Sequence, residues 1–186
     1  MTSQQNDRAS PSRSQAIVRR LVIAVGVVLA LWLIWSALGG DLLPVGSKAP
    51  GWTLPLADGS GKNLSLDDLE GRVAVLDFWS TTCPPCLKQM EDLTALWRRM
   101  KPRGLEVVGV ACGGESVAEI ESFADGRAVR YPLVVDRTGA VAGAYRVSSL
   151  PTLYLIGPDG AIAAAHSGYW PRDDLAAAVS ELIEDR

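Results

Sequence analysis

Near its middle the chain reads Val73-Ala-Val-Leu-Asp-Phe-Trp79-Ser-Thr-Thr-Cys83-Pro-Pro-Cys86. The first seven of these residues are almost all apolar, a pattern typical of a strand that is buried on both faces of a sheet. After Cys86, apolar residues recur at helical spacing as far as Met100. The stretch therefore predicts a central strand, a short turn that carries two cysteines, and a helix over residues 87–100.

The two cysteines lie where that helix is expected to begin. Unpaired backbone N–H groups and the positive end of the helix dipole stabilise a thiolate there, and the pKa of such a cysteine can fall to about 3.5 to 7.5. We predict that Cys83 is the nucleophile that attacks a disulfide, and that Cys86, which faces inward, resolves the mixed disulfide. Pro84 and Pro85 suit the first helical positions, where no N–H bond is needed.

Half of a zinc site is the alternative interpretation of this Cys-x-x-Cys pair. The other candidate ligands, Cys112 and the single histidine His166, lack the spacing of a second pair. Cys112 follows a predicted strand, where a small core residue is favoured over a third redox thiol, and His166 is expected to pack or lie at the surface. Three cysteines are too few for a disulfide framework, and a net charge of −3 gives no basic field for nucleic acid. Redox chemistry is the preferred interpretation.

Strands and helices are expected to alternate on both sides of the dithiol. Around a Gly-rich turn, residues 52–64 predict an N-terminal hairpin, and Gly157-Pro-Asp-Gly160 predicts a turn between two antiparallel strands. The remaining elements are a helix start at 65–68, strands at 105–111, 131–135, 152–156 and 162–166, helices at 115–124 and 171–184, and a helical turn at 138–145. This order predicts an α/β fold with a central mixed sheet flanked by helices.

The N-terminal region has the composition of a membrane anchor. Residues 1–20 carry four arginines and one aspartate, whereas residues 21–40 carry no charge. About 20 apolar residues span a bilayer as a helix, and the positive-inside rule keeps an arginine-rich flank in the cytoplasm. We therefore expect a cytoplasmic tail at 1–20, a single transmembrane helix at 21–40, a linker at 41–50, and a domain at 51–186 outside the cytoplasm.

A cleaved signal peptide is the alternative for this region, because Ala37-Leu38-Gly39 offers a small-x-small cleavage site. The apolar run is longer than a usual signal core of about 7 to 15 residues, which favours the anchor. In both interpretations the domain is exported from the cytoplasm. We expect it on the outer side of the cytoplasmic membrane, which in a bacterium is the periplasm or the outer cell surface.

Three motifs in a fixed order resemble the thioredoxin superfamily: Asp77-Phe-Trp79, Cys83-Pro-Pro-Cys86 and Leu150-Pro-Thr152. Within it the chain is most similar to the membrane-anchored TlpA/ResA group, which has an N-terminal hairpin and an inserted helix and strand. The resemblance implies a thiol-disulfide oxidoreductase with a thioredoxin-like fold. It also implies a cis bond before Pro151 and a substrate-binding surface that includes Leu150, Pro151, Thr82 and Trp79. A strand-start proline is the alternative for Pro151.

The sequence departs from that group at three positions near the dithiol. Thr82 stands where relatives often have a tryptophan, and Gln89 stands where many have a glutamate. Asp77 replaces a common asparagine and matches the buried acid of the thioredoxins. A carboxyl group in an apolar strand has a raised pKa, so we hypothesise that Asp77 accepts the proton of Cys86. A solvated position at the end of the strand is the alternative for Asp77.

The resulting functional prediction is a reductase of disulfides in exported proteins, with the haem-attachment cysteines of apocytochrome c as a substrate class that the resemblance implies. No histidine lies between the cysteines to stabilise the thiolate, which favours a reducing couple. We expect a membrane electron donor of the thiol-transfer type and no cofactor or metal besides the Cys83–Cys86 disulfide. The alternatives are a Cu(I)-binding assembly factor, and a thiol oxidase or peroxidase of the same fold.

Overall fold

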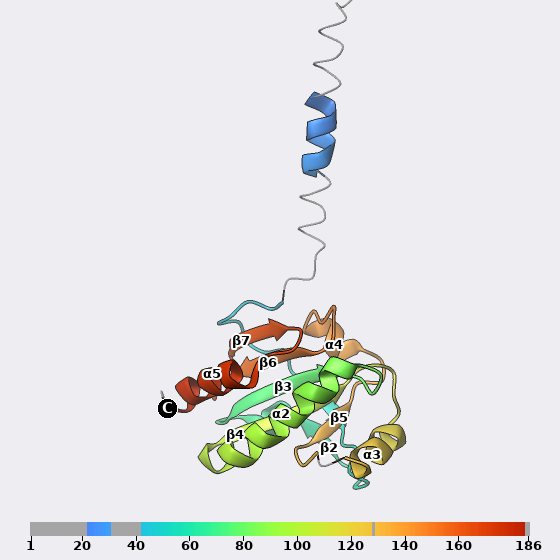
Figure 1. Ribbon diagram of the computed structural model, residues 1–186, viewed down its shortest axis with the longest axis vertical. Helices are drawn as coiled ribbons and strands as arrows, with labels where there is room; N and C mark the ends of the chain where they lie inside the picture. Colours follow the sequence, from blue (N-terminus) through green and yellow to red (C-terminus); the bar gives the residue numbers. More distant parts are fainter. Residues whose placement is uncertain (1–21, 31–41, 128, 185–186) are drawn as a thin grey trace, which may run out of the picture. The chain divides into compact units, whose positions relative to one another are not determined.

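The computed structural model describes residues 22–30, 42–127 and 129–184. The chain divides into two units, Met1–Gly40 and Asp41–Arg186 (Figure 1). Residues 22–30 are helical, and the rest of the predicted tail and transmembrane segment lies outside the described residues. Within the described ranges, no helix combines the length and the apolar character needed to cross a membrane.

A five-stranded mixed sheet forms the centre of the second unit, in the order β5-β4-β3-β6-β7. β3 runs parallel to β4 and antiparallel to β6, β4 runs parallel to β5, and β6 and β7 form an antiparallel pair. The strands are β3 (Val73–Trp79), β4 (Leu105–Ala111), β5 (Leu133–Val135), β6 (Thr152–Ile156) and β7 (Ile162–Ser167). The predicted mixed sheet with β3 at its centre is thus confirmed.

Helices cover both faces of this sheet. Figure 1 shows α2 lying across one of these faces. Because side chains alternate along a strand, Val75 and Trp79 of β3 pack on one face with α2, α3 and α5, while Leu76 and Phe78 pack on the other face near α4. The helices are α2 (Pro84–Met100), α3 (Val117–Asp125), α4 (Ala140–Ala144) and α5 (Arg172–Glu184), with 3-10 turns η1 (Asp67–Leu69) and η2 (Lys101–Arg103). The predicted N-terminal hairpin is formed by β1 (Thr53–Pro55) and β2 (Asn63–Ser65).

Several boundaries differ from those predicted. The segment 42–50 is no free linker, because the backbone N–H groups of Gly46 and Ala49 donate to the carbonyls of Ile162 and Gly160 at 2.8 and 3.0 Å. The inserted helix begins at Val117, where a Ser116–Glu119 capping box satisfies its first N–H groups. The predicted helix at 65–68 is only the turn η1, and the strand at 131–135 is shortened to β5.

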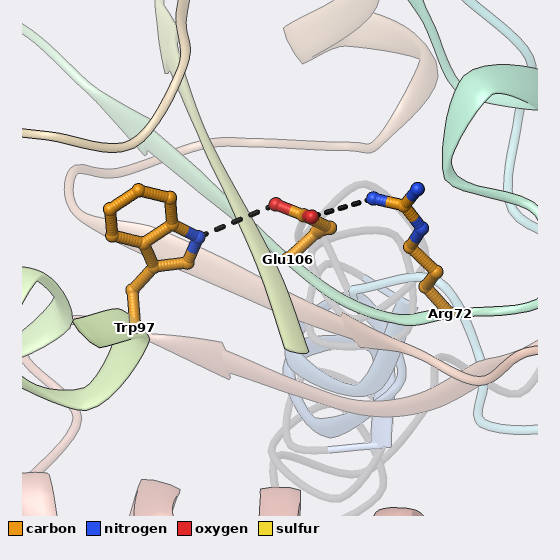
Figure 2. A network of polar contacts seen from close by, with 3 residues as sticks. All are labelled: Arg72, Trp97 and Glu106. Atoms are coloured by element: carbon orange, nitrogen blue, oxygen red, sulfur yellow. Dashed lines mark hydrogen bonds and ion pairs between the residues drawn. The ribbon is translucent and has the colours of Figure 1, made fainter. Parts of the chain in front are cut away.

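A paired polar network lies near the start of β3 and β4 (Figure 2). The Glu106 carboxylate accepts a hydrogen bond from Arg72 Nη1 at 2.6 Å and from Trp97 Nε1 at 3.4 Å. Trp97 comes from α2, so these contacts join the helix to the sheet at the end of the strands away from the cysteines. The network satisfies a partly buried carboxylate whose side chain is 13% exposed.

Candidate active site

The dithiol lies at the start of α2, where β3 has just ended. Cys83 is the residue that precedes the first helical turn, and Pro84 and Pro85 occupy its first positions, as predicted. A disulfide joins Cys83 to Cys86, with a Cα–Cα distance of 5.3 Å. Cys83 is half-buried, whereas Cys86 is completely buried. One sulfur is therefore open to attack a partner from outside, and the other is protected.

The Leu150–Pro151 peptide bond is cis, as the resemblance implied. It lies beside the dithiol because Thr152, the next residue, pairs with Phe78 near the end of β3. Two hydrogen bonds hold this turn: the Thr152 hydroxyl donates to the Ser149 carbonyl at 2.7 Å, and Gly168 N donates to the Pro151 carbonyl at 2.8 Å. Pro151 is buried and Leu150 is half-buried, so the exposed part of this turn is its preceding serine pair.

Asp77 is completely buried in β3, two residues before the strand ends, on the same face as Trp79 and toward α2, which carries Cys86. Among the residues that the structure describes, neither of its carboxylate oxygens has a hydrogen-bond partner. Burial raises the pKa of Asp77 to about 8. The predicted burial is confirmed, and the alternative of a solvated strand end is wrong because the central strand is covered on both faces.

Comparisons with known proteins agree with this fold and dithiol. The sequence model of the AhpC/TSA family matches residues 45–165. The chain belongs to the AhpC/TSA family. It is 35% identical over 157 residues to thiol-disulfide oxidoreductase ResA of Bacillus subtilis, covering 81% of this chain and 86% of the relative. The ResA protein of Geobacillus kaustophilus is 34% identical, with 84% and 92% covered.

A solved structure supports the same assignment. This chain matches the structure of a thiol:disulfide interchange protein from Bacteroides sp., with a TM-score of 0.67 and 26% sequence identity. The match covers 76% of this chain and 91% of that one. With the Cys83–Cys86 dithiol in place, these relatives make the chain a thiol-disulfide oxidoreductase.

Thr82 and Gln89, two positions at which the sequence departs from the TlpA/ResA group, have different surroundings in this AhpC/TSA-family site. Thr82 is exposed, and its hydroxyl forms a hydrogen bond with the Ser80 hydroxyl at 3.0 Å. Gln89 is completely buried, and its Oε1 accepts a hydrogen bond from the backbone N–H of Trp170 at 2.7 Å. Gln89 therefore joins α2 to the segment before α5, a role that its position in the sequence did not reveal.

Trp79 does not lie on the substrate-facing surface, contrary to the prediction. Its side chain is completely buried, and its ring lies against Phe123 of α3 with centroids 5.0 Å apart. The cause is that β3 is covered on both faces, and residue 79 points to the face that α2 and α3 cover. Trp79 therefore contributes to the interior beneath the dithiol.

Glu115 is a site residue that the sequence did not indicate. Its Oε1 accepts hydrogen bonds from the backbone N–H and the hydroxyl of Thr81, at 2.8 and 3.0 Å. Burial opposes the ionisation of Glu115, but hydrogen bonds from Thr81, the Glu115 backbone and Ser80 together outweigh burial and lower the pKa of Glu115. The carboxylate thus fixes the turn just before Cys83. No local signal marks this contact, because it joins segments 34 residues apart.

The remaining cysteine and histidine have packing roles. The half-buried Cys112 thiol donates to the Trp79 carbonyl at 3.6 Å, and burial, followed by the charges of Asp136 and Glu115, raises its pKa to about 12. It therefore keeps its proton at neutral pH. His166 stacks on Trp170 with ring centroids 5.1 Å apart. Across the described residues, no three His, Cys, Asp or Glu side chains are grouped as a metal site would require.

Proposed function

We propose that this protein is a membrane-tethered reductase of disulfides in exported proteins. The observation that carries the proposal is the asymmetric dithiol, with a half-buried Cys83 at a helix N-terminus and a completely buried Cys86. A dithiol of this kind can react with a large partner through one sulfur and complete the reaction through the other. The cis-proline turn lies beside it, where a substrate chain would be received.

The first step uses the reduced protein. The Cys83 thiolate attacks one sulfur of the substrate disulfide, so that this S–S bond breaks and a Cys83–substrate disulfide forms. The second substrate sulfur leaves as a thiolate and takes a proton from solvent. The helix N-terminus favours a negative charge beside it, and this position therefore suits Cys83 as the attacking thiolate.

The second step requires Cys86 to lose its proton inside the protein. In the proposal, the Asp77 carboxylate accepts that proton, and the Cys86 thiolate then attacks the Cys83 sulfur. The Cys83–Cys86 disulfide forms, the substrate leaves as its second thiolate, and two electrons have passed from the dithiol to the substrate. Because burial raises the pKa of Asp77 to about 8, its proton affinity is close to that of a thiol.

The reducing direction is supported by Pro84 and Pro85, which supply no histidine or other cation to stabilise the Cys83 thiolate. A less stabilised thiolate makes the disulfide form relatively more favourable, and the dithiol a better reductant. A membrane electron donor of the thiol-transfer type would regenerate the dithiol. The similarity to ResA proteins supports a search for substrates among apocytochrome c haem-attachment cysteines.

The membrane tether and the extracytoplasmic location are part of the same proposal. Residues 21–40 carry no charge and follow an arginine-rich flank, and residues 22–30 are helical. Cysteines introduced singly at Ser10 and at Gly61, in a protein whose Cys83, Cys86 and Cys112 are replaced by serine, test this topology in intact cells. A membrane-impermeant maleimide should label the Gly61→Cys protein alone, and labelling of residue 10 alone would contradict the proposal.

A trapping experiment tests the reaction. Reduced Cys86→Ala protein, mixed with an oxidised Cys-x-x-Cys-His peptide, should accumulate a Cys83–peptide disulfide that mass spectrometry detects. The matched Cys83→Ala variant should form no comparable adduct, since Cys86 is buried. An adduct that forms as fast on Cys86, or a wild-type dithiol that does not reduce the peptide, would contradict the proposed function.

A further inference from the structure

Seven buried side-chain polar atoms in the described residues lack a hydrogen-bond partner. Four of them belong to three side chains on the α2 face of the sheet: the two carboxylate oxygens of Asp77, Trp79 Nε1 and the Tyr131 hydroxyl. Asp77 and Trp79 are 0% exposed and Tyr131 is 4% exposed. Buried polar groups in proteins are nearly always satisfied, by protein groups or by internal water, so four such atoms in one region call for a shared explanation.

The surroundings of Gly109 bring Trp79 and Tyr131 together. A Cβ atom at Gly109 would lie 2.6 Å from Leu133 Cδ2, 3.0 Å from Trp79 Nε1 and 3.3 Å from Tyr131 Cε2, the ring carbon next to the one that bears the hydroxyl. Gly109 is also the partner of Asp77 in the parallel β3–β4 ladder, where adjacent strands lie about 4.8 Å apart. Because Asp77 and Trp79 are two residues apart, they face the same side of the sheet.

The chemistry of these groups is complementary. The indole N–H can only donate a hydrogen bond, and an ionised carboxylate can only accept one. Burial, and after it the charge of Asp77, raises the pKa of Tyr131, so its hydroxyl keeps its proton and is a donor. Because residue 109 is glycine, Leu133, Trp79 Nε1 and the Tyr131 ring can all pack closely against the backbone beside Asp77, where any side chain would collide with them. Two donors and one acceptor thus lie in the same region.

We propose that Tyr131 and Trp79 form a hydrogen-bonding site above Gly109 for the Asp77 carboxylate, reached directly or through one internal water. This site favours the ionised form of Asp77, which is the form that can accept a proton from Cys86. Tyr131 is therefore a positioning residue for the reaction. The catalytic meaning of this site rests on the proposed role of Asp77, whereas the coupling between Tyr131 and Asp77 does not.

The surroundings of Asp77 limit what else could control its ionisation. Its neighbour on β6 is the apolar Leu153, and its neighbour on β4 is Gly109. The titratable groups near it are Cys86 from α2, Tyr131 from the segment before β5, and Cys112 after β4. The pKa of Cys112 is raised first by burial and then by the charges of Asp136, Glu115 and Asp77. Tyr131 is the one among these that offers a permanent O–H donor over the relevant pH range.

The experiment compares Tyr131→Phe with the parent protein, using the full chain in detergent micelles with carbon-13 labelled aspartate. The Asp77 carboxyl signal is assigned by its loss in Asp77→Asn and titrated by NMR in the oxidised protein. Loss of a donor to the carboxylate should raise the pKa of Asp77, lowering its acid dissociation constant about tenfold. The Tyr145→Phe variant is the control, since its hydroxyl donates to the Pro50 carbonyl on the other face of the sheet.

The outcomes separate this inference from the proposed function. A pKa shift in Tyr131→Phe but not in Tyr145→Phe supports the site, and an unchanged Asp77 titration in Tyr131→Phe overturns it. In the kinetic assay, the pH profile of mixed-disulfide resolution should move to higher pH in Tyr131→Phe alone. If Asp77→Asn leaves that profile unchanged while the NMR shift is present, the proton role fails and the coupled site stands.

Discussion

The strand pair β3–β4 holds a carboxylate beside a tryptophan near each end, and the two arrangements differ. Near the start of the pair, Glu106 is bonded to Trp97 and Arg72 (Figure 2). Toward the end that leads to the dithiol, Asp77 lies near Trp79, and neither side chain has a hydrogen-bond partner in the described part of the chain. The first carboxylate is partly exposed and paired, whereas the second is completely buried.

This difference indicates that the two ends serve different purposes. A paired carboxylate with an exposed partner contributes about 1 kcal/mol or less to stability, because solvent screens the Arg72 charge. A buried and unpaired carboxyl group costs stability whenever it ionises, and perturbed pKa values of this kind cluster at functional sites. Ionisation of Asp77 therefore lowers the stability of the protein at the dithiol end, whereas the paired Glu106 has no such effect at the other end.

The largest effect is expected from Asp77→Asn. Since the folded pKa of about 8 lies above the unfolded value of 3.8, the folded state binds more protons between these values, and stability falls as pH rises from about 4 to 8. The substitution should remove this loss. We expect a gain on the order of 2 to 4 kcal/mol in the free energy of unfolding above pH 8, and almost none below pH 4.

The same variant should lose activity while it gains stability. Without a proton acceptor for Cys86, resolution of the mixed disulfide at pH 7 should slow about 100-fold. Denaturant unfolding across the pH range and stopped-flow kinetics measure the two quantities on one preparation. Equal stability of Asp77→Asn and the parent protein at pH 9 would contradict the proposed difference between the two ends. So would an unchanged rate and pH profile of mixed-disulfide resolution.

A smaller effect of opposite sign is expected from Glu106→Gln. The variant loses the charge-assisted bond to Arg72 and weakens the bond to Trp97, so unfolding should become easier by about 1 kcal/mol. Activity should stay within about twofold of the parent protein, since the network lies away from Cys83. Chemical denaturation and the disulfide reduction assay test both statements. A large loss of activity would mean that the two ends are coupled.

The smallest effect is expected from Cys112→Ala. Because the pKa of this half-buried thiol is raised to about 12, it should not react with iodoacetamide at pH 7.5, and its loss should leave the reduction assay unchanged. Mass spectrometry of the oxidised protein after alkylation measures the reactivity. Rapid labelling of Cys112, or an altered rate in the variant, would assign a third thiol to the dithiol end.

Sequence reasoning succeeded where a feature depends on neighbouring residues. The apolar run Val73–Trp79 predicts a central buried strand by itself, and the prolines place Cys83 at a helix start. The burial of Asp77 follows from the same run. The cis bond before Pro151 was available only through family resemblance, since no local pattern distinguishes it from a strand-start proline.

The features that sequence reasoning missed depend on contacts between distant segments. Glu115 bonds to Thr81 across 34 positions, and Tyr131 reaches the region of Asp77 only because β4 and β5 are neighbours. Segment 42–50 has the proline and glycine content of a linker, yet its backbone bonds to residues near the β6–β7 turn. Composition does not reveal such pairings, because they are set by the register of the sheet.

The reduction potential of the Cys83–Cys86 couple tests the central claim most directly. It can be measured by equilibrating the full chain in detergent with thiol–disulfide buffers of known potential and quantifying the free thiols. We predict a reducing value near that of thioredoxin, about −270 mV at pH 7. A value near −120 mV would identify an oxidant of thiols and contradict the proposed function.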